Sequence, residues 1–271
     1  MIKVSFQGER GAYSEAAARS FFSEQIETMP LPTFAIVLES TISDSTEYSV
    51  LPIENSLEGS VGESYDLLYS TSLNATGEIY YRIEHCLIGN GKLDEVDTVY
   101  SHPQALGQCR NFIQKYNMKT VPTYDTAGSV KIIKEINKPN VSCIASKTAS
   151  QIYNVSIISE NIANNLNNYT RFIVLSKKTN EETGNDKTSI IFSIKHEPGS
   201  LFRIIENFHK YNINLTKIES RPTKSTNWEY NFYVDFEGHA KNPQISQMLE
   251  KIKNETLLMK ILGSYPSAKL N

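Results

Sequence analysis

The sequence predicts an α/β protein of two parts, a larger N-terminal part with alternating strands and helices and a smaller βαββαβ part at the C-terminus. Short apolar strands run into polar turns and then into helices over the first 175 residues. The segment SKKTNEETGND, residues 176–186, contains no large apolar residue and is typical of a linker. With 271 residues, the chain is long enough for two parts that each bury a core.

The larger part repeats a strand, a polar turn and a helix, which is the pattern of a largely parallel sheet. Three of these junctions place a hydroxyl at or near the start of the helix, namely Ser14, Ser101 and Thr126. Ligands of such sheets bind at the carboxyl ends of the strands, where helix N-termini present free N–H groups. Three such helix starts around one cleft favour an anionic ligand. Ser and Thr are also preferred helix caps, so a structural explanation of each hydroxyl stays open.

A polar turn interrupts this pattern after a strand that we expect to end at Pro52. Glu54 and Asn55 begin the turn, which runs on to Gly59 and Gly62. Taken alone, this turn is either a solvated loop or part of a site.

A hydroxyl and a guanidinium stand at the start of another strand, the apolar run Phe172–Leu175 that Thr170 and Arg171 directly precede. Successive side chains of a strand point to opposite faces. If the strand is already extended at this point, Thr170 and Phe172 share one face while Arg171 lies on the other.

The smaller part begins after the linker and alternates between strand and helix patterns. Leu201, Ile204, Ile205 and Phe208 have the i, i+3, i+4, i+7 spacing of a helix, for which Ser200 is the expected N-cap. Asn242 and Pro243 predict the N-cap and first residue of a second helix. The expected strands are 187–195, 213–221, 230–237 and a last one near 259–262. The order βαββαβ is that of the split βαβ, or ferredoxin-like, unit.

Composition and spacing exclude several classes of function. Lys plus Arg (27) and Asp plus Glu (30) give a net charge of −3 without a basic stripe, so we expect no nucleic-acid partner. No apolar run approaches the ~18 residues of a membrane-spanning helix. The N-terminus enters a strand without a signal-peptide pattern, which predicts a cytoplasmic protein.

The spacing of cysteines, histidines and glycines gives no support for a disulfide, metal or nucleotide site. Cys86, Cys109 and Cys143 are far apart and odd in number, and the five histidines form no ligand pair. We therefore expect no metal. Gly8 and Gly11 form only part of a dinucleotide fingerprint, so we also expect no NAD.

Seven stretches, in this order and at these spacings, resemble those of the prephenate dehydratase family and cover the whole chain. They are GAYSEAA, PIENSLEGSV, SHPQALGQC, DTAGSV, NYTRFIVL, PGSL and IESRP. The resemblance implies a catalytic domain of two α/β lobes, residues 1–178, folded like a type II periplasmic binding protein. It also implies a C-terminal ACT regulatory domain, residues 187–271. The βαββαβ pattern agrees with the second domain independently.

The resemblance further implies a lyase that converts prephenate into phenylpyruvate, water and carbon dioxide in phenylalanine biosynthesis. Formation of the aromatic ring drives this reaction, so no cofactor is expected. Thr170 is implied as the essential hydroxyl, and Glu54 is a candidate proton source behind it. Asn55, Ser101 and Gln108 are implied as hydrogen-bonding residues for the substrate, although Gln108 lies roughly 10 Å further along the expected helix than Ser101.

Three other residues belong to the expected site, and the roles of two of them, Arg171 and His102, stay open. Phe172 is expected to line the substrate ring. Arg171 either binds a substrate carboxylate or forms a structural ion pair. His102 suits a general base, but at a helix start before Pro103 it is more often a capping or packing residue.

In the ACT domain, the resemblance implies an allosteric phenylalanine site between neighbouring subunits, and therefore a homodimer or homotetramer. Its residues are Gly199, Ser200, Leu201, Glu219, Ser220, Arg221 and Pro222.

Other functions compete with this interpretation. Ala12 replaces a Thr of many family members, and GAYSEAA resembles plant enzymes that prefer arogenate, the amino analogue of prephenate. A non-catalytic amino-acid sensor is a second alternative, against which the combination of Thr170, Glu54 and Asn55 argues. A fused chorismate mutase is not expected, since the chain starts at the dehydratase motif.

Overall fold

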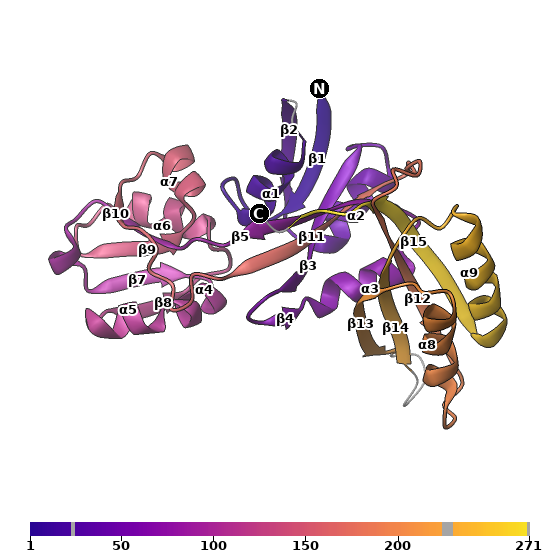
Figure 1. The fold of residues 1–271 in the computed structure, drawn as a ribbon. Coiled ribbons are helices and arrows are strands. Elements are labelled where there is room, and N and C mark those ends of the chain that lie inside the picture. The colour runs from indigo at the N-terminus through magenta and orange to yellow at the C-terminus, as the bar shows by residue number, and fades with distance from the viewer. Residues whose placement is uncertain (23–24, 224–229, 270–271) are drawn as a thin grey trace. The chain divides into compact units, whose positions relative to one another are not determined.

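The computed structural model describes residues 1–22, 25–223 and 230–269 (Figure 1). The chain forms two compact units. The larger unit comprises Met1–Val61 and Ile79–Phe172, and the smaller unit comprises Gly62–Glu78 and Ile173–Asn271. Strands β5 (Asn74–Arg82) and β11 (Tyr169–Ser176) therefore carry residues of both units.

The first sheet has the strand order β2-β1-β3-β11-β5, with β4 paired to β3. Its other elements are β1 (Ile2–Gln7), α1 (Tyr13–Phe21), β2 (Ile26–Leu31), α2 (Phe34–Ile42), β3 (Tyr48–Asn55) and β4 (Gly59–Ser60). β1 runs parallel to β2 and β3, as the strand and helix alternation predicts. Val4, Phe6, Val50 and Leu51 are fully buried in the core of this sheet, which α1 helps to cover with Ala17.

The second sheet has the order β10-β6-β9-β7-β8. Its elements are β6 (Cys86–Gly89), η1 (Leu93–Glu95), β7 (Thr98–Ser101), α4 (Pro103–Gln108), α5 (Arg110–Lys115), β8 (Lys119–Pro122), α6 (Gly128–Ile136), β9 (Val141–Ala145), α7 (Lys147–Tyr153) and β10 (Ile157–Ser159). β7 is parallel to β8 and β9, whereas β6 is antiparallel to β9. The sheet is therefore mixed, with parallel and antiparallel pairs side by side.

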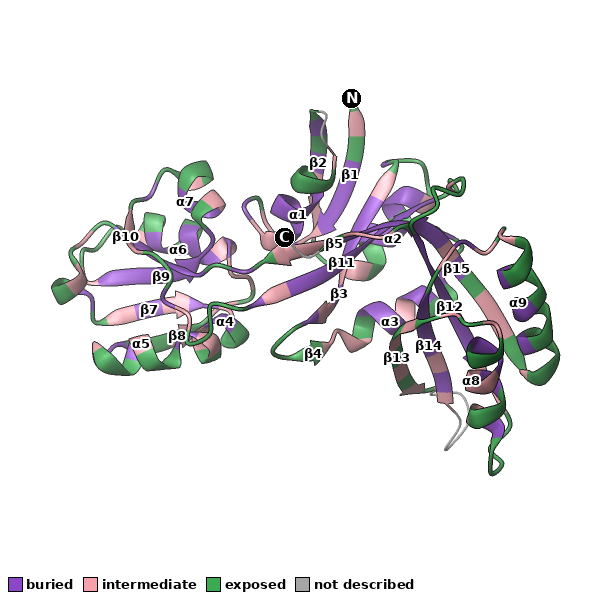
Figure 2. Ribbon diagram, in the orientation of Figure 1, coloured by how far each residue is buried: buried purple, intermediate pink, exposed green. Residues whose placement is uncertain are grey.

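Helices cover both faces of this second sheet, and the alternation of β9 explains how. The strand is buried along its whole length (Figure 2). Cys143 and Ala145 pack with α6 and α7, whereas Ile144 packs with α4 and α5. Adjacent side chains thus serve opposite cores, as the period of two requires. The three cysteines are buried free thiols of these cores.

The smaller unit contains the predicted βαββαβ order. Its elements are β12 (Asp186–Ser193), α8 (Ser200–Lys210), β13 (Leu215–Pro222), β14 (Tyr230–Glu237), α9 (Pro243–Glu255) and β15 (Leu258–Pro266). The sheet is antiparallel with the order β13-β14-β12-β15. Ile204 of α8 and Met248 of α9 pack with Phe192 and Val234 in one core. Helix α3 (Gly62–Ser70) also belongs to this unit, and its Tyr65 lies edge-on to Tyr233 at 4.8 Å.

Local details at helix ends confirm one prediction and correct another. The Asn242 side chain accepts a hydrogen bond from Gln244 N at 3.1 Å, so the predicted cap of α9 is confirmed. The prediction that Ser200 caps α8 is wrong, because Gly199 is the N-cap and Ser200 is the first helical residue. Gly199 has φ = 81°, a left-handed conformation that costs glycine little.

Two element boundaries also differ from the predicted ones. Strand β3 continues to Asn55, three residues beyond Pro52, because its end pairs with β4. The helix expected after Ser101 is divided at Cys109 into α4 and α5. No helix in the described part of the chain is long and apolar enough to cross a membrane.

Candidate active site

A cavity of about 290 Å³ lies in the larger unit, and its lining comes from the first sheet and from the helices of the second sheet. Its polar lining residues are Gln7, Tyr13, Ser14, Asn55, His85, His102, Gln104, Gln108, Tyr124, Asp125, Thr126 and Thr170. Its apolar lining residues are Ala12, Phe34, Pro52, Val61, Ile83, Ala105 and Phe172. The volume and the mixture of apolar wall and converging polar groups fit a small-molecule site.

Thr170 lines this cavity from the start of β11. The residue is 9% exposed. Asn55 Nδ2 donates to Thr170 Oγ1 at 3.0 Å and to Asn168 Oδ1 at 2.7 Å. Because Asn55 supplies a donor, the Thr170 oxygen acts as an acceptor in this bond and its own proton is available to a ligand.

Asn55 is itself held by the turn between β3 and β4. Its Oδ1 accepts hydrogen bonds from Leu57 N at 3.0 Å and from Glu58 N at 3.1 Å. An Asn side chain that bonds the backbone two residues later is the usual device of such a turn. The amide group is therefore oriented with its nitrogen toward Thr170.

The residues next to Thr170 and Asn55 in the chain point alternately toward the cavity and away from it, as the alternation of a strand requires. Thr170 and Phe172 line the cavity and Arg171 does not, which confirms the predicted faces. Arg171 is 4% exposed, with its guanidinium carbon 6.0 Å from the centroid of the Tyr80 ring. Glu54 pairs with Ser60 across β3 and β4 and is not among the lining residues.

Of the hydroxyls expected at helix starts, Ser14 and Thr126 line the cavity and Ser101 does not. Ser101 is the last residue of β7, fully buried, and its Oγ donates to Ile144 O at 2.7 Å. This bond joins β7 to β9 and accounts for a polar side chain in the core. Gln108 lines the cavity, so of these two implied substrate residues only Gln108 lies at its wall.

The start of α1 leaves backbone donors at the cavity wall. The N-cap of this helix is Ala12, which has no side chain able to cap it. The first N–H groups of a helix have no partner within the helix and attract anions. His102 instead caps α4, since its Nδ1 accepts from Gln104 N at 3.3 Å. The predicted capping role of His102 is thus confirmed.

Four residues that sequence reasoning did not identify also belong to the site: Tyr13, His85, Asp125 and Asn168. Asn168 is fully buried and joins Asn55 to Gln108, while the other three line the cavity. Burial raises the pKa of Asp125, although the Gly128 N–H that bonds its Oδ1 at 2.6 Å opposes this shift. No residue spacing signals these positions.

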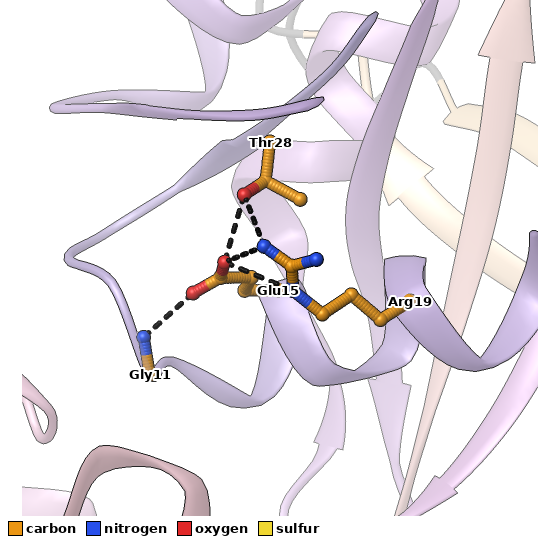
Figure 3. A network of polar contacts seen from close by, with 4 residues as sticks. All are labelled: Gly11, Glu15, Arg19 and Thr28. Carbon is orange, nitrogen blue, oxygen red and sulfur yellow. Dashed lines mark hydrogen bonds and ion pairs between the residues drawn. The ribbon is translucent and has the colours of Figure 1, made fainter. Parts of the chain in front are cut away.

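A buried carboxylate stabilises the turn that enters α1. Glu15 is 1% exposed and accepts hydrogen bonds from Gly11 N at 2.7 Å, Thr28 Oγ1 at 2.7 Å and Arg19 Nη2 at 2.8 Å (Figure 3). Burial by itself raises the pKa of Glu15, but these bonds outweigh burial and lower the pKa below its ordinary value. Glu15 thus fixes the loop that carries Ala12.

We expect Glu15→Gln to destabilise the protein by about 2 kcal/mol at pH 7, because a buried carboxylate with three donors is lost. The folded pKa lies below the unfolded one, so this stabilisation is present above about pH 4.5 and is lost as the pH falls through the folded value. Urea unfolding at several pH values measures it. Glu27→Gln is the control, since its ion pair with Lys3 is exposed. A difference from wild type that does not shrink in acid would contradict the expectation.

Within the described residues, no group of three or more His, Cys, Asp and Glu side chains is arranged to hold a metal ion.

A second cavity, of about 310 Å³, lies at the start of α8 in the smaller unit. Its lining includes Gly199, Ser200 and Leu201, together with Tyr230 and Phe232 of β14. The other stretch of the expected effector site, residues 219–222, is not part of this lining.

The stretch 219–222 lies on β13, and its Arg221 makes a contact on the other face of the sheet. Arg221 Nε donates to Asp66 Oδ1 of α3 at 3.3 Å. The guanidinium also lies over Gly62, where an added Cβ would come within 2.6 Å of Nη2. Arg221 thus connects β13 to α3.

The sequence was compared with family models and with known proteins, and it matches both. A family model described as prephenate dehydratase matches residues 4–180, and one described as an ACT domain matches residues 188–254. The chain is 36% identical over 271 residues to a bifunctional chorismate mutase/prephenate dehydratase of Aquifex aeolicus (strain VF5), covering 99% of this chain and 75% of that protein. It is also 36% identical over 285 residues to arogenate dehydratase 2 of Petunia hybrida, covering 98% of this chain and 72% of that protein.

A solved structure shares the whole architecture. The prephenate dehydratase from Arthrobacter aurescens, in complex with L-Phe, superposes with a TM-score of 0.90 at 27% identity. The match covers 98% of this chain and 90% of that chain, so it extends over both compact units.

Proposed function

The chain belongs to the prephenate dehydratase family, and from this membership we propose that it converts prephenate into phenylpyruvate, water and carbon dioxide. One observation carries the proposal: the Thr170 hydroxyl lies on the wall of a polar cavity with its oxygen held by Asn55. A hydroxyl fixed in this way is a hydrogen-bond donor of defined direction. The departing ring hydroxyl of prephenate is the group that needs such a donor.

The proposed reaction needs positioning and a proton. Prephenate loses a ring carboxylate as carbon dioxide, the electron pair of that bond enters the ring, and the ring hydroxyl leaves with one added proton as water. Aromatisation supplies the driving force, so no electron sink is required. Thr170 donates a hydrogen bond to the departing oxygen, and Phe172 lies beside the ring.

The two carboxylates of the substrate account for other features of the cavity. The free N–H groups of α1, near Ser14, suit one carboxylate. Thr126 and Gln108, which also line the cavity, offer further donors. Glu54 does not line the cavity, so we propose that its proton reaches the substrate only by way of a second group. We propose Arg171, on the reverse face of β11, as a positioning residue.

We also propose the boundaries of the domains, with a catalytic domain at residues 1–178 and an ACT domain at residues 187–271. The end of β11 at Ser176 and the start of β12 at Asp186 support a linker between them. Buried free cysteines support a cytoplasmic enzyme.

Phenylalanine is proposed as an allosteric inhibitor that binds at the start of α8. The loop around Gly199, Ser200 and Leu201 borders a cavity with aromatic walls, which suits an amino acid with a phenyl ring. We propose that residues Glu219, Ser220, Arg221 and Pro222 complete the site in a homodimer or homotetramer. β13 is an edge strand with Ile218 47% exposed, which supports pairing with a second subunit.

We expect Ser200→Ala and Arg221→Ala to raise the phenylalanine concentration for half-inhibition roughly tenfold or more, since each removes a polar contact or charge. The uninhibited rate should change much less. Inhibition curves measure both quantities. Lys210→Ala, at the exposed end of α8, is the control. Unchanged inhibition in both test variants would exclude the proposed effector site.

The proposed function is tested by mixing the purified protein with prephenate and following phenylpyruvate by ultraviolet absorption, with and without phenylalanine. Product that forms and declines with phenylalanine supports both halves of the proposal. Arogenate is the rival substrate, favoured by Ala12 in the wall and by the similarity to the Petunia enzyme. Phenylalanine formed from arogenate, without product from prephenate, would establish the rival. Turnover of neither substrate would leave the amino-acid sensor.

A further inference from the structure

A continuous chain of polar side chains runs from Thr170 to a histidine that the proposed reaction does not use. Asn55 joins Thr170 to Asn168, and Asn168 Nδ2 donates to Gln108 Oε1 at 3.0 Å. Gln108 Oε1 also lies 2.9 Å from His85 Nε2. The chain thus links β3, β11, α4 and the segment before β6.

The orientation of each amide in this chain follows from its backbone anchor. Asn55 Oδ1 accepts from two backbone N–H groups, so its nitrogen must face Asn168 Oδ1. Asn168 must then present its nitrogen to Gln108, and Gln108 must present its oxygen. Amide and ring orientations are assigned from such partners, and here the sequence of donors leaves one solution.

This solution determines the tautomer of His85. An oxygen at 2.9 Å from Nε2 that is already an acceptor needs a donor, so Nε2 carries the proton. The other tautomer would place two lone pairs against each other. On the far side of the ring, the Tyr13 hydroxyl lies 3.0 Å from Nδ1 and 2.7 Å from Glu84 O. Both of these atoms are acceptors in this tautomer, so they share the single proton of the hydroxyl.

The His85 ring is buried and fixed by its neighbours. It is 3% exposed, and its ring lies edge-on to Tyr13 at 5.6 Å and 77°. Burial lowers the pKa of His85, which agrees with a neutral ring at pH 7. The groups around the ring are the Tyr13 hydroxyl, the Glu84 carbonyl and Gln108, with Glu58 behind the Gln108 amide at 3.4 Å.

We propose that His85 is a positioning residue, which as the Nε2–H tautomer holds the Gln108 oxygen and so keeps Asn168, Asn55 and the Thr170 hydroxyl aligned toward the cavity. The inference rests on the proposed role of Thr170. Without the His85 donor, Gln108 keeps only its bond from Asn168 and its 3.4 Å contact with Glu58, so this end of the amide chain is held less firmly. A misplacement of about 1 Å at the reacting group lowers the rate on the order of 100-fold.

The test compares two amide substitutions that retain different halves of the imidazole. The nitrogen of Gln reaches the position of Nε2, whereas the Asn amide reaches only that of Nδ1. We expect His85→Gln to retain kcat within about fivefold, and His85→Asn to lower kcat roughly 10–100-fold with a smaller change in KM. His209→Gln, on the exposed end of α8, is the matched control.

Two further readouts separate positioning from proton transfer and from simple loss of folding. The pH profile of kcat in His85→Gln should keep the limbs of wild type, because a positioning residue does not titrate in the reaction. Nitrogen-15 NMR of the unmodified protein should show a protonated Nε2 and an unprotonated Nδ1 at pH 7. This second measurement needs neither a variant nor an active enzyme.

Several outcomes would overturn the proposal. Equal loss of kcat in His85→Gln and His85→Asn, with both variants folded by circular dichroism, would show that the Nε2 donor is not the relevant feature. A pH limb that disappears in His85→Gln would make His85 an acid or base instead. An Nδ1–H tautomer would contradict the assigned chain. Absence of any dehydratase activity in wild type would refute the proposed function. The NMR measurement would still test whether His85 is the Nε2–H tautomer that the hydrogen-bond chain requires.

Discussion

Replacing Thr170 by valine is expected to lower kcat by about 10²–10⁴-fold, the range of a lost general-acid or hydrogen-bond contribution. Valine keeps the branched shape, so the neighbouring packing with Phe172 is retained. Only the hydroxyl is exchanged for a methyl group. Asn55 Nδ2 loses one acceptor but retains Asn168 Oδ1 at 2.7 Å and Tyr169 O at 3.2 Å. The loss should therefore appear in the chemical step and not in folding.

Thr170→Ser is the matched variant, since it keeps the hydroxyl and removes the methyl group. We expect it to retain most of the activity, within about tenfold, because the Asn55 bond still holds its oxygen. Thermal unfolding of both variants and phenylalanine binding by calorimetry serve as controls for folding. A valine variant with a near-normal rate would rule out the hydroxyl as the group that assists departure of the ring oxygen.

Much of the fold could be predicted because the patterns that specify it are local. The spacing of Ile204 and Phe208 predicted the buried face of α8, and alternation predicted β14 with its observed bounds, Tyr230–Glu237. The break between α4 and α5 at Cys109 was not predicted, because the residues around Cys109 are equally compatible with one continuous helix. The left-handed N-cap at Gly199 was not predicted either, because Ser200 is itself a common N-cap residue. The antiparallel direction of β6 was not predicted, because it depends on its pairing with β9, which no local pattern reveals.

The candidate site divides in a similar way. Thr170, Phe172 and Asn55 were placed by motif resemblance and strand alternation, and the structure brings all three to one cavity. His85 could not be found in this way, because a single histidine between strands has no diagnostic spacing. Its role emerges only from partners distant in the chain, such as the amide pair Asn55 and Asn168, which are 113 positions apart.

A buried ion pair in the smaller unit gives the second large expected effect. Lys187 of β12 donates to Glu78 Oε1 of β5 at 2.6 Å, and their side chains are 6% and 0% exposed. Glu78 also accepts a hydrogen bond from Ala268 N at 3.1 Å. The pair thus joins the segment 62–78 to the sheet of its own unit. From sequence, Lys187 was only the polar first residue of a strand.

Lys187→Met is expected to lower the free energy of unfolding by about 3–5 kcal/mol, because it removes one partner of a buried ion pair, the ammonium that donates to the Glu78 carboxylate. The melting temperature of the unit should fall on the order of 10 °C. Adding Glu78→Gln should recover much of the loss, since Gln is neutral and still accepts the Ala268 N–H. Lys210→Met removes an exposed pair with Glu206 and should have little effect. A double variant no more stable than Lys187→Met alone would show that packing, and not the loss of the ion pair, causes the lower stability.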